Sequence, residues 1–217
     1  MSEKKPRIAR RVAQELEDGE LVNLGIGLPT MVADYIPDDI DITLHSENGF
    51  VGLGPTPPEG EEDKDLINAG GQPVTIREGG AFFDSATSFA IIRGGHLDTT
   101  VLGALEVDAG GNLANWKIPE KLVPGMGGAM DLTTGARRVI VATTHTTRRG
   151  DSKIVQDCDL PLTAAGEVDL IVTELALFSV EEDGLLLLEK EESTEIEEIE
   201  KMTDADFEIS ERLGVFA

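Results

Sequence analysis

Residues 21–49 read LVNLGIGLPTMVADYIPDDIDITLHSENG, and this stretch decides the class of fold. It begins with an apolar run at residues 21–24, which predicts a strand that ends in a glycine turn. Residues 31–35 are predicted to be helical, and residues 40–44 form a second apolar run that predicts another strand. Strand, helix and strand in this order are typical of α/β proteins with parallel pairing.

The flanking sequence continues the same pattern. Ile8, Val12 and Leu16 recur every four positions, so a helix is predicted over residues 7–17, with Gly19 as its stop. Another helix is predicted at 85–93, and residues 52–64, rich in glycine, proline and acid, are predicted to be a loop. Further strands are predicted at 99–107, 113–118, 139–143 and 168–173, then a hairpin of 176–180 and 185–188, and a late helix at 194–202. Early alternation followed by a hairpin predicts an α/β fold with a mixed sheet, as a single domain over residues 1–217.

Composition narrows the class of protein. The chain has 217 residues, of which 40% are hydrophobic, which suits a globular protein. Apolar runs such as residues 185–188 are far below the roughly 18 residues that span a bilayer, and residues 1–11 lack the apolar core of a signal peptide. Cys158 is the only cysteine, so an internal disulfide is excluded and an inert core thiol is expected. We therefore expect a cytoplasmic protein without a membrane partner.

The charge is strongly negative. Asp and Glu number 42 against 18 Lys and Arg, which gives a formal net charge of −24. Such a chain repels nucleic acid, because the phosphate backbone has the same sign. Acidic residues are spread along most of the sequence rather than confined to a tail. The pattern favours a folded surface adapted to high salt over a disordered acidic tail.

Common catalytic and cofactor motifs are absent from the sequence. No phosphate-binding loop of the Gly-x-x-x-x-Gly-Lys-Ser/Thr type occurs, and there is no pair of cysteines. His45, His96 and His145 are about 50 residues apart, so the spacing predicts no metal site. Gly25 and Gly27 resemble the start of a dinucleotide fingerprint, but the third glycine is missing from its required place.

Glu47 is the strongest candidate for chemistry. It directly follows a predicted strand, and α/β folds bind their ligands at the carboxyl ends of strands. The Asn48-Gly49 pair that follows is also a strong turn signal. The residues alone leave both interpretations open, a functional carboxylate and an ordinary turn.

A series of motifs, in collinear order over roughly residues 7–212, resembles the beta subunit of 3-oxoacid coenzyme A (CoA) transferases of class I. The active-site motif of that family is matched by Ser46-Glu47-Asn48-Gly49 followed by residues 52–55. Each further match is modest alone, but together they are specific and favour the functional interpretation of Glu47. They lie at residues 23–30, 65–70, 80–85, 88–90, 92–96, 113–116, 125–131, 160–163 and 173–174.

The resemblance implies a fold and a set of site residues. It implies an open mixed sheet with helices on both faces, the architecture shared by CoA-transferases and sugar-phosphate isomerases. It makes Glu47 the nucleophile and Gly128 an oxyanion donor, since glycine exposes its backbone N–H. Asn48, Gly49 and Gly127 are expected to bind substrate or CoA, with Asn48 orienting Glu47 or a substrate carbonyl. No cofactor is expected, because the CoA thioester is itself the substrate.

The same resemblance implies the reaction and the partner. CoA would move between an acyl-CoA and a short 3-oxo acid in ping-pong fashion, through an acyl-glutamyl anhydride and a glutamyl-CoA thioester on Glu47. A homologous alpha subunit would complete the enzyme as a heterodimer or heterotetramer. An acyl-CoA hydrolase of the same fold and a non-catalytic ligand-sensing domain remain alternatives. The sequence leaves open whether the acid is acetoacetate, 3-oxoadipate or a butyrate-type acid.

Three departures from the family pattern stand out. His45 occupies a position where the family commonly has glutamine, and Glu120 replaces a usual glycine before Lys121. Residues 146–149 also differ from the usual pattern. None of them alters Glu47, but the last two are expected to affect contacts with substrate or partner.

Overall fold

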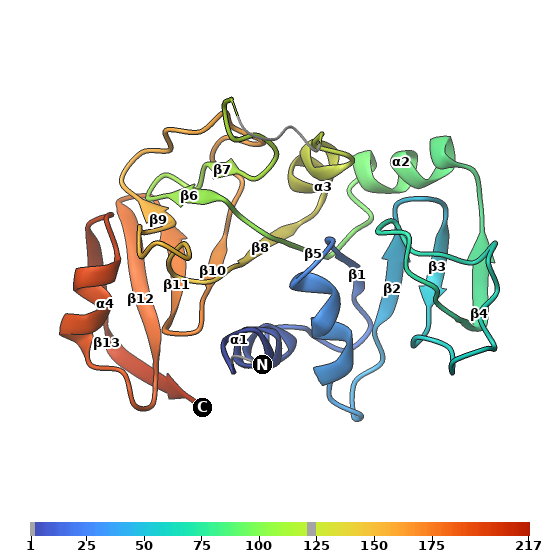
Figure 1. The fold of residues 1–217 in the computed structure, drawn as a ribbon, viewed down its shortest axis with the longest axis horizontal. Helices are drawn as coiled ribbons and strands as arrows, with labels where there is room; N and C mark the ends of the chain where they lie inside the picture. The colour runs from blue at the N-terminus through green and yellow to red at the C-terminus, as the bar shows by residue number, and fades with distance from the viewer. Residues whose placement is uncertain (1–2, 121–124) are drawn as a thin grey trace.

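A computed structural model describes residues 3–120 and 125–217 (Figure 1). Its main feature is a ten-stranded sheet, which confirms the predicted mixed α/β fold. The order of its strands is β13-β12-β11-β10-β8-β5-β1-β2-β3-β4. The five central strands, from β10 to β2, pair in parallel, and each outer strand of this group has an antiparallel neighbour, β11 beside β10 and β3 beside β2.

The centre of the sheet contains the predicted strand–helix–strand unit. β1 (Leu21–Leu24) pairs in parallel with β2 (Thr43–Ser46) on one side and with β5 (Thr99–Leu102) on the other. The chain therefore leaves β1 toward one side of the sheet and later returns to the opposite side, which opens a crevice at the carboxyl ends of these strands. β8 (Arg138–Ala142) and β10 (Leu170–Val172) continue the parallel part.

Local contacts shift several predicted boundaries. The strand predicted at residues 40–44 begins only at Thr43, because Asp41 is held by Asp18 and Gly19 through two hydrogen bonds of 2.7 and 2.8 Å. The prediction of one strand over residues 99–107 is wrong. Its second half is β6 (Glu106–Asp108), which belongs to a separate three-stranded sheet with β7 (Leu113–Ala114) and β9 (Ile154–Val155).

Both edges of the large sheet contain strands that the sequence pattern did not predict. β3 (Phe50–Leu53) and β4 (Ile76–Phe82) form one edge, and β13 (Phe207–Phe216) forms the other. The β3–β4 pair depends on glycine, because a Cβ on Gly52 would lie 2.8 Å from the Cα of Gly80. Beside β13, the predicted hairpin of β11 (Ala176–Glu181) and β12 (Gly184–Glu191) is confirmed.

Helices cover both faces of the sheet, as expected. α1 (Lys4–Ala13) and the 3₁₀ helix η1 (Pro29–Tyr35) pack on one face, whereas α2 (Ser85–Arg93), α3 (Ala129–Gly135) and α4 (Ile196–Met202) lie on the other (Figure 1). α1 begins and ends earlier than residues 7–17. The 3₁₀ helix starts two residues before the helix predicted at residues 31–35, and α2 has the predicted bounds.

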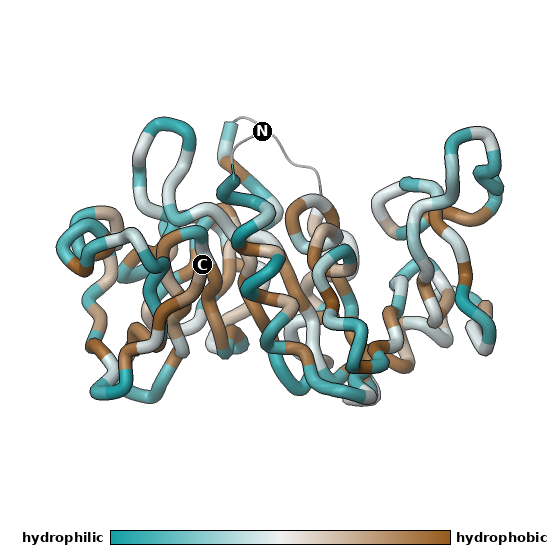
Figure 2. Tube along the Cα trace, turned by 90° about the horizontal axis from the view of Figure 1, so that it is seen from below, coloured by the Kyte–Doolittle hydropathy of each residue, from teal (hydrophilic) through white to brown (hydrophobic). Residues whose placement is uncertain are grey.

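Side chains that alternate along the central strands build two apolar cores. Val101 and Ile140 point to the core under α1, whereas Leu102, Val139 and Val141 point to the core under α2, α3 and α4. This alternation is the two-residue period of a strand that is buried on both faces. In Figure 2, brown hydrophobic stretches of the trace gather in the central part of the molecule.

The helices and the backbone at Glu120 each add one observation. Within the described residues, the helices are too short and too polar to cross a bilayer. Glu120, which stands where the family usually has glycine, adopts a left-handed backbone conformation with φ of +62°. This conformation explains why glycine is favoured there. Lys121, the next residue, lies outside the described residues.

Candidate active site

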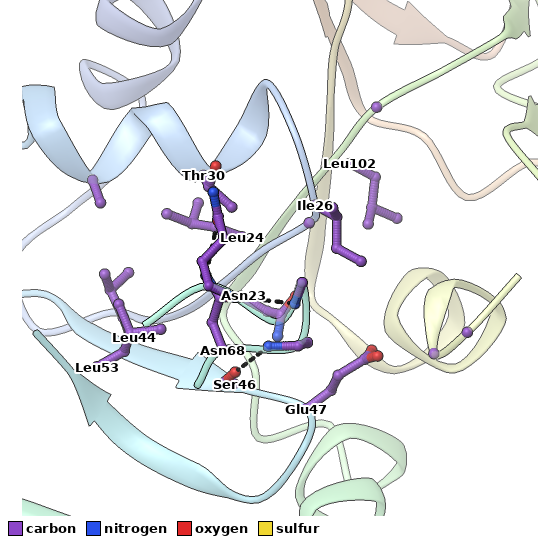
Figure 3. Close-up of a pocket in the computed structure, with 18 of the residues that line it drawn as sticks. Asn23, Leu24, Ile26, Thr30, Leu44, Ser46, Glu47, Leu53, Asn68 and Leu102 are labelled. Carbon is purple, nitrogen blue, oxygen red and sulfur yellow. Dashed lines mark hydrogen bonds between the residues drawn. The ribbon is translucent and has the colours of Figure 1, made fainter. Parts of the chain in front are cut away.

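Three neighbouring parallel strands end at one edge of the sheet and form the floor of a cavity. Gly25 follows β1, Glu47 follows β2 and Gly103 follows β5, and all three line a cavity of about 780 Å³ (Figure 3). The cavity therefore lies at the crevice that the strand order creates. Its walls come from η1, from residues 53–56 and 68–74, and from the glycine-rich stretch at residues 125–128.

Glu47 is the only glutamate in the cavity lining among the described residues. Its side chain extends from the end of β2 toward the segment that precedes α3 (Figure 3). A Cβ built on Gly128 would lie 2.1 Å from Glu47 Oε2, and one built on Gly127 would lie 3.7 Å from Oε1. The structure thus brings together Glu47, Gly127 and Gly128, which are about 80 residues apart in the sequence.

Opposing effects act on the ionisation of Glu47. Burial raises the pKa of this carboxyl above its ordinary value, and the negative charge of Asp131 adds to the rise. A hydrogen bond from the Gly128 backbone N–H acts the other way, because it stabilises the anion. The net direction is upward, which is the direction that makes a carboxylate a better base and nucleophile.

Asn48 contacts the neighbouring loop rather than Glu47. Its Oδ1 accepts a hydrogen bond from Ser46 Oγ at 2.7 Å, and its Nδ2 donates to the Ile67 carbonyl at 2.7 Å. The Ala69 backbone N–H also donates to Ser46 Oγ. Asn48 does not line the cavity, so its expected role in binding remains a prediction.

Gly49 makes the turn between β2 and β3 feasible. Its φ of +127° is in the region that favours glycine, and a Cβ there would lie 2.3 Å from the Phe83 carbonyl oxygen. Its carbonyl accepts a hydrogen bond from the Phe83 N–H at 2.9 Å. Gly49 also lies outside the cavity lining, and its expected contact with substrate remains a prediction.

His45 forms hydrogen bonds with residues on two neighbouring elements. Asn23 Nδ2 donates to His45 Nδ1 at 3.1 Å, so Nε2 carries the proton and donates to Ser88 Oγ at 3.0 Å. Burial lowers the pKa of His45 to about 4, which keeps the ring neutral near pH 7. His45 thereby connects β1, β2 and α2, a role that sequence reasoning missed although the residue was noted as a departure from the family.

The charged and titratable side chains of the cavity lining determine which ligands it can hold. Within residues 3–120 and 125–217, no lysine or arginine lines it, and Asp34, His45 and Glu47 are its titratable side chains. The same residues contain no group of three or more His, Cys, Asp or Glu side chains arranged to hold a metal ion. Cys158 lies elsewhere, and burial together with nearby Asp108 raises the pKa of its thiol, which disfavours the nucleophilic thiolate.

Sequence reasoning also missed most of the outer wall. Ile26, a residue that is 66% exposed, and the loop at residues 68–74 contribute much of it. The only signal was that Ile26 and residues 68–70 belong to motifs of the family. Contact between them is tertiary, because a Cβ on Gly70 would lie 3.4 Å from Ile26 Cγ2.

Comparison with known proteins identifies relatives of this chain. Residues 5–201 match the family described as coenzyme A transferase. The beta subunit of the acetate CoA-transferase of Haemophilus influenzae is 56% identical, over 95% of this chain and 92% of that protein. The B-type subunit of a probable succinyl-CoA:3-ketoacid coenzyme A transferase of Bacillus subtilis is 49% identical, over 97% of this chain and 98% of that protein.

Solved structures show the same fold at low sequence identity. An acyl-CoA transferase from Escherichia coli, YdiF, aligns with a TM-score of 0.79 at 24% identity over 99% of this chain. This chain spans only 43% of the length of that longer chain. A variant of the decarboxylase AibA/AibB aligns with a TM-score of 0.77 at 24% identity, so the fold by itself does not decide the reaction. The family match and the relatives named as beta-type or B-type subunits show that this chain belongs to the coenzyme A transferase family, as a subunit of that same type.

Proposed function

We propose that this chain is the catalytic half of an enzyme that moves CoA between an acyl-CoA and a short 3-oxo acid, with Glu47 as nucleophile. The observation that carries the proposal is the placement of the Glu47 carboxylate at the end of β2, inside the cavity and against the Gly128 backbone N–H. Relatives are named as acetate, succinyl-CoA:3-ketoacid and 3-oxoadipate CoA-transferases. Their names support the class of reaction and leave the acid open.

The reaction divides a slow exchange into covalent steps. A Glu47 oxygen attacks the thioester carbonyl, the C–S bond breaks, and an acyl-glutamyl anhydride and CoA thiolate form. The thiolate attacks the Glu47 carbonyl carbon, which releases the first acid as a carboxylate and leaves a glutamyl-CoA thioester. The second acid then attacks this thioester, and the same two steps in reverse regenerate Glu47. Charge balances at every step, and no proton is consumed.

Gly128 has a defined part in this sequence. Each attack on a carbonyl carbon creates a tetrahedral centre whose oxygen carries negative charge. The Gly128 N–H already stabilises the Glu47 anion, and the same donor can stabilise the oxyanion that forms on Glu47 when thiolate or acid attacks it. Loss of one such donor costs about 3 kcal/mol of transition-state stabilisation.

The cavity favours an acid whose far end is uncharged. Its lining within the described residues lacks lysine and arginine, and Asp34 adds a negative charge. A second carboxylate would lose water there without gaining a counterion from the described lining residues. This supports a short acid such as acetoacetate over a dicarboxylic one.

A partner subunit is part of the proposal. Relatives of nearly the same length are named as the beta-type or B-type subunits of their enzymes, which supports an alpha subunit of homologous fold as the partner. Ile26 lines the cavity and is largely exposed, which supports a partner that covers this part of the wall and completes the CoA site.

Covalent trapping tests the proposal. The assembled enzyme is incubated with acetoacetyl-CoA, and its peptides are mapped by mass spectrometry. We expect CoA on the peptide that contains Glu47, discharge of the adduct by acetoacetate or acetate, and no adduct in Glu47→Gln. The variant Glu78→Gln, in exposed strand β4, serves as control and should form the adduct normally. An adduct on another residue would overturn the role of Glu47, and discharge by water alone would indicate a hydrolase.

A further inference from the structure

Arg93 and Asp131 belong to family-like motifs, but the proposed mechanism does not use them. Arg93 is the last residue of α2, and Asp131 lies in the first turn of α3. Their side chains form an ion pair, Arg93 Nε to Asp131 Oδ1. The pair joins two helices that pack against each other above the carboxyl ends of the central strands (Figure 1).

This ion pair is connected to Gly128 by direct contacts. The Arg93 guanidinium lies over the ring of Phe89, 5.7 Å from its centroid. The Cζ of Phe89 is in turn 3.3 Å from the position where a Cβ on Gly128 would lie. Gly128 immediately precedes α3, so α2 contacts it through Phe89 while the ion pair holds the first turn of α3. Displacement of the pair would therefore move the Gly128 N–H relative to Glu47.

One member of the pair, Asp131, also acts on the charge of the nucleophile. Asp131 is the charged group that acts on Glu47 by direct electrostatic repulsion. Its side chain is 25% exposed, so solvent weakens the repulsion only in part, whereas Arg93 is 67% exposed. Bound to Asp131, Arg93 offsets part of the negative charge that Glu47 experiences.

We propose that Asp131 and Arg93 are positioning residues: their ion pair joins α2 to the first turn of α3 and so holds the Gly128 N–H against the Glu47 carboxylate. The inference rests on the proposed role of Glu47 as nucleophile. In this proposal the negative charge of Asp131 disfavours the ionised form of Glu47, and the positive charge of Arg93 reduces that effect. The segments involved are α2 and α3, and α3 also contributes Ala129 and Leu132 to the cavity lining.

Other charged or titratable groups surround the site within the described residues. His45 on β2 is neutral above about pH 4, because burial lowers its pKa. Asp34 on η1 lines the cavity, and Asp84 begins α2, where it accepts a hydrogen bond from the Thr87 N–H. They are retained in every variant below, so they contribute the same background to each pH profile.

The sign of the effect follows from the chemistry. Glu47 must be ionised to attack, so kcat/KM falls as the pH drops through the pKa of Glu47. Removing the charge of Asp131 removes a repulsion, which lowers this pKa and moves the acid limb to lower pH. Removing the charge of Arg93 leaves Asp131 uncompensated, which moves the limb to higher pH. Loss of structure alone would lower the rate in both variants without moving the limb in opposite directions.

The test measures pH profiles of kcat/KM for the assembled enzyme. We expect Asp131→Asn and Arg93→Gln to shift the acid limb in opposite directions, and the double variant to return it toward the wild-type position. Arg93→Lys keeps the charge and should keep the limb in place even if the maximal rate falls. Arg137→Gln is the matched control, because the Arg137–Asp98 pair has nearly the same exposure, 67% and 29%, and lies outside the cavity. It should leave the profile unchanged.

Two results would overturn the inference: shifts in the same direction, or unchanged limbs in folded variants. Where thermal melting shows that Asp131→Asn is unfolded, Asp131→Ser and the Arg93 variants supply the comparison. Mass spectrometry separates this failure from failure of the proposed function. A CoA adduct on Glu47 with unmoved limbs rejects only the role of the ion pair, whereas absence of the adduct rejects the nucleophile itself.

Discussion

At the scale of single residues, the site depends on the missing side chain of Gly128. The Glu47 carboxylate occupies the space that a Cβ on Gly128 would need, at 2.1 Å from Oε2. Glycine is thus required for close approach of the nucleophile, in addition to the expected role of its N–H. The family-like motif pointed to Gly128 as an oxyanion donor, and the geometry adds this steric reason.

Gly128→Ala tests the close approach. The added methyl group must displace Glu47 by more than about 1 Å, and a displacement of this size costs roughly a hundredfold in rate. We expect a loss of about that size in kcat/KM with little change in melting temperature, because Glu47 is only half-buried. Gly110→Ala is the control, since the nearest atom to its Cβ is 3.5 Å away, an ordinary contact. Retention of more than half of the wild-type activity in Gly128→Ala would contradict the prediction.

At the scale of elements, basic side chains of α1 bind carboxylates on residues 174–191, late in the chain. Arg11 donates two hydrogen bonds to Glu189 on β12, at 2.7 and 3.0 Å, and also pairs with Glu15 at 2.7 Å. Lys4 and Arg7, on the same helix, form ion pairs with Glu174 and Glu191. The helix was predicted from its apolar residues, which pack on the sheet, and its basic residues add ion pairs to residues late in the chain.

Replacing Arg11 tests this connection. Its side chain is 7% exposed, so Arg11→Met leaves Glu15 and Glu189 close together without their shared cation. Loss of one partner of a buried ion pair costs about 3–5 kcal/mol, and partial exposure of these carboxylates reduces the expected loss in the free energy of unfolding to about 2–3 kcal/mol. Arg10→Met, at an exposed neighbouring position over the Tyr35 ring, should cost at most about 1 kcal/mol. Urea unfolding measures both variants, and equal losses would refute the role of the connection.

At the scale of the whole molecule, the net charge of −24 governs the response to salt. Eighteen basic residues cannot pair with 42 acidic ones, so most carboxylates must be balanced by cations from solution. The anionic substrates enter a cavity whose described lining lacks lysine and arginine. Repulsion among surface carboxylates should therefore oppose folding, assembly and substrate binding at low ionic strength.

Thermal melts and rate assays across sodium or potassium chloride concentrations test this expectation. The Debye length falls from about 30 Å at 0.01 M salt to about 3 Å at 1 M, which removes repulsion between distant carboxylates. Melting temperature and activity should rise over this range. Sodium chloride and a neutral osmolyte at matched osmolality separate charge screening from general stabilisation. Flat or falling curves would show that the acidic surface serves solubility only, and would leave the role of Glu47 untouched.

Local pattern was enough to predict the central part of the fold. The apolar run at β1, the bounds of α2 and the hairpin of β11 and β12 were all predicted, because each depends on neighbouring residues in the chain. Glu47 could be singled out for the same reason, since it directly follows an apolar strand and lies in a family-like motif. The edge strands β4 and β13 could not be predicted, because β4 is rich in glycine and polar residues, whereas β13 is largely exposed without a regular alternation and shifts its register against β12.

What only the tertiary structure decided is which distant residues meet. The sequence by itself determined a mixed α/β sheet with a carboxylate at the end of its second strand. The parallel order β5-β1-β2 then placed the ends of three strands at one edge, and packing of α2 against α3 brought Gly128, Phe89 and Asp131 to Glu47. Contacts across such separations depend on burial of both faces of the sheet, and local periodicity does not record them. The raised pKa of Glu47 has the same origin, because burial and the charge of Asp131 arise only when the chain is folded.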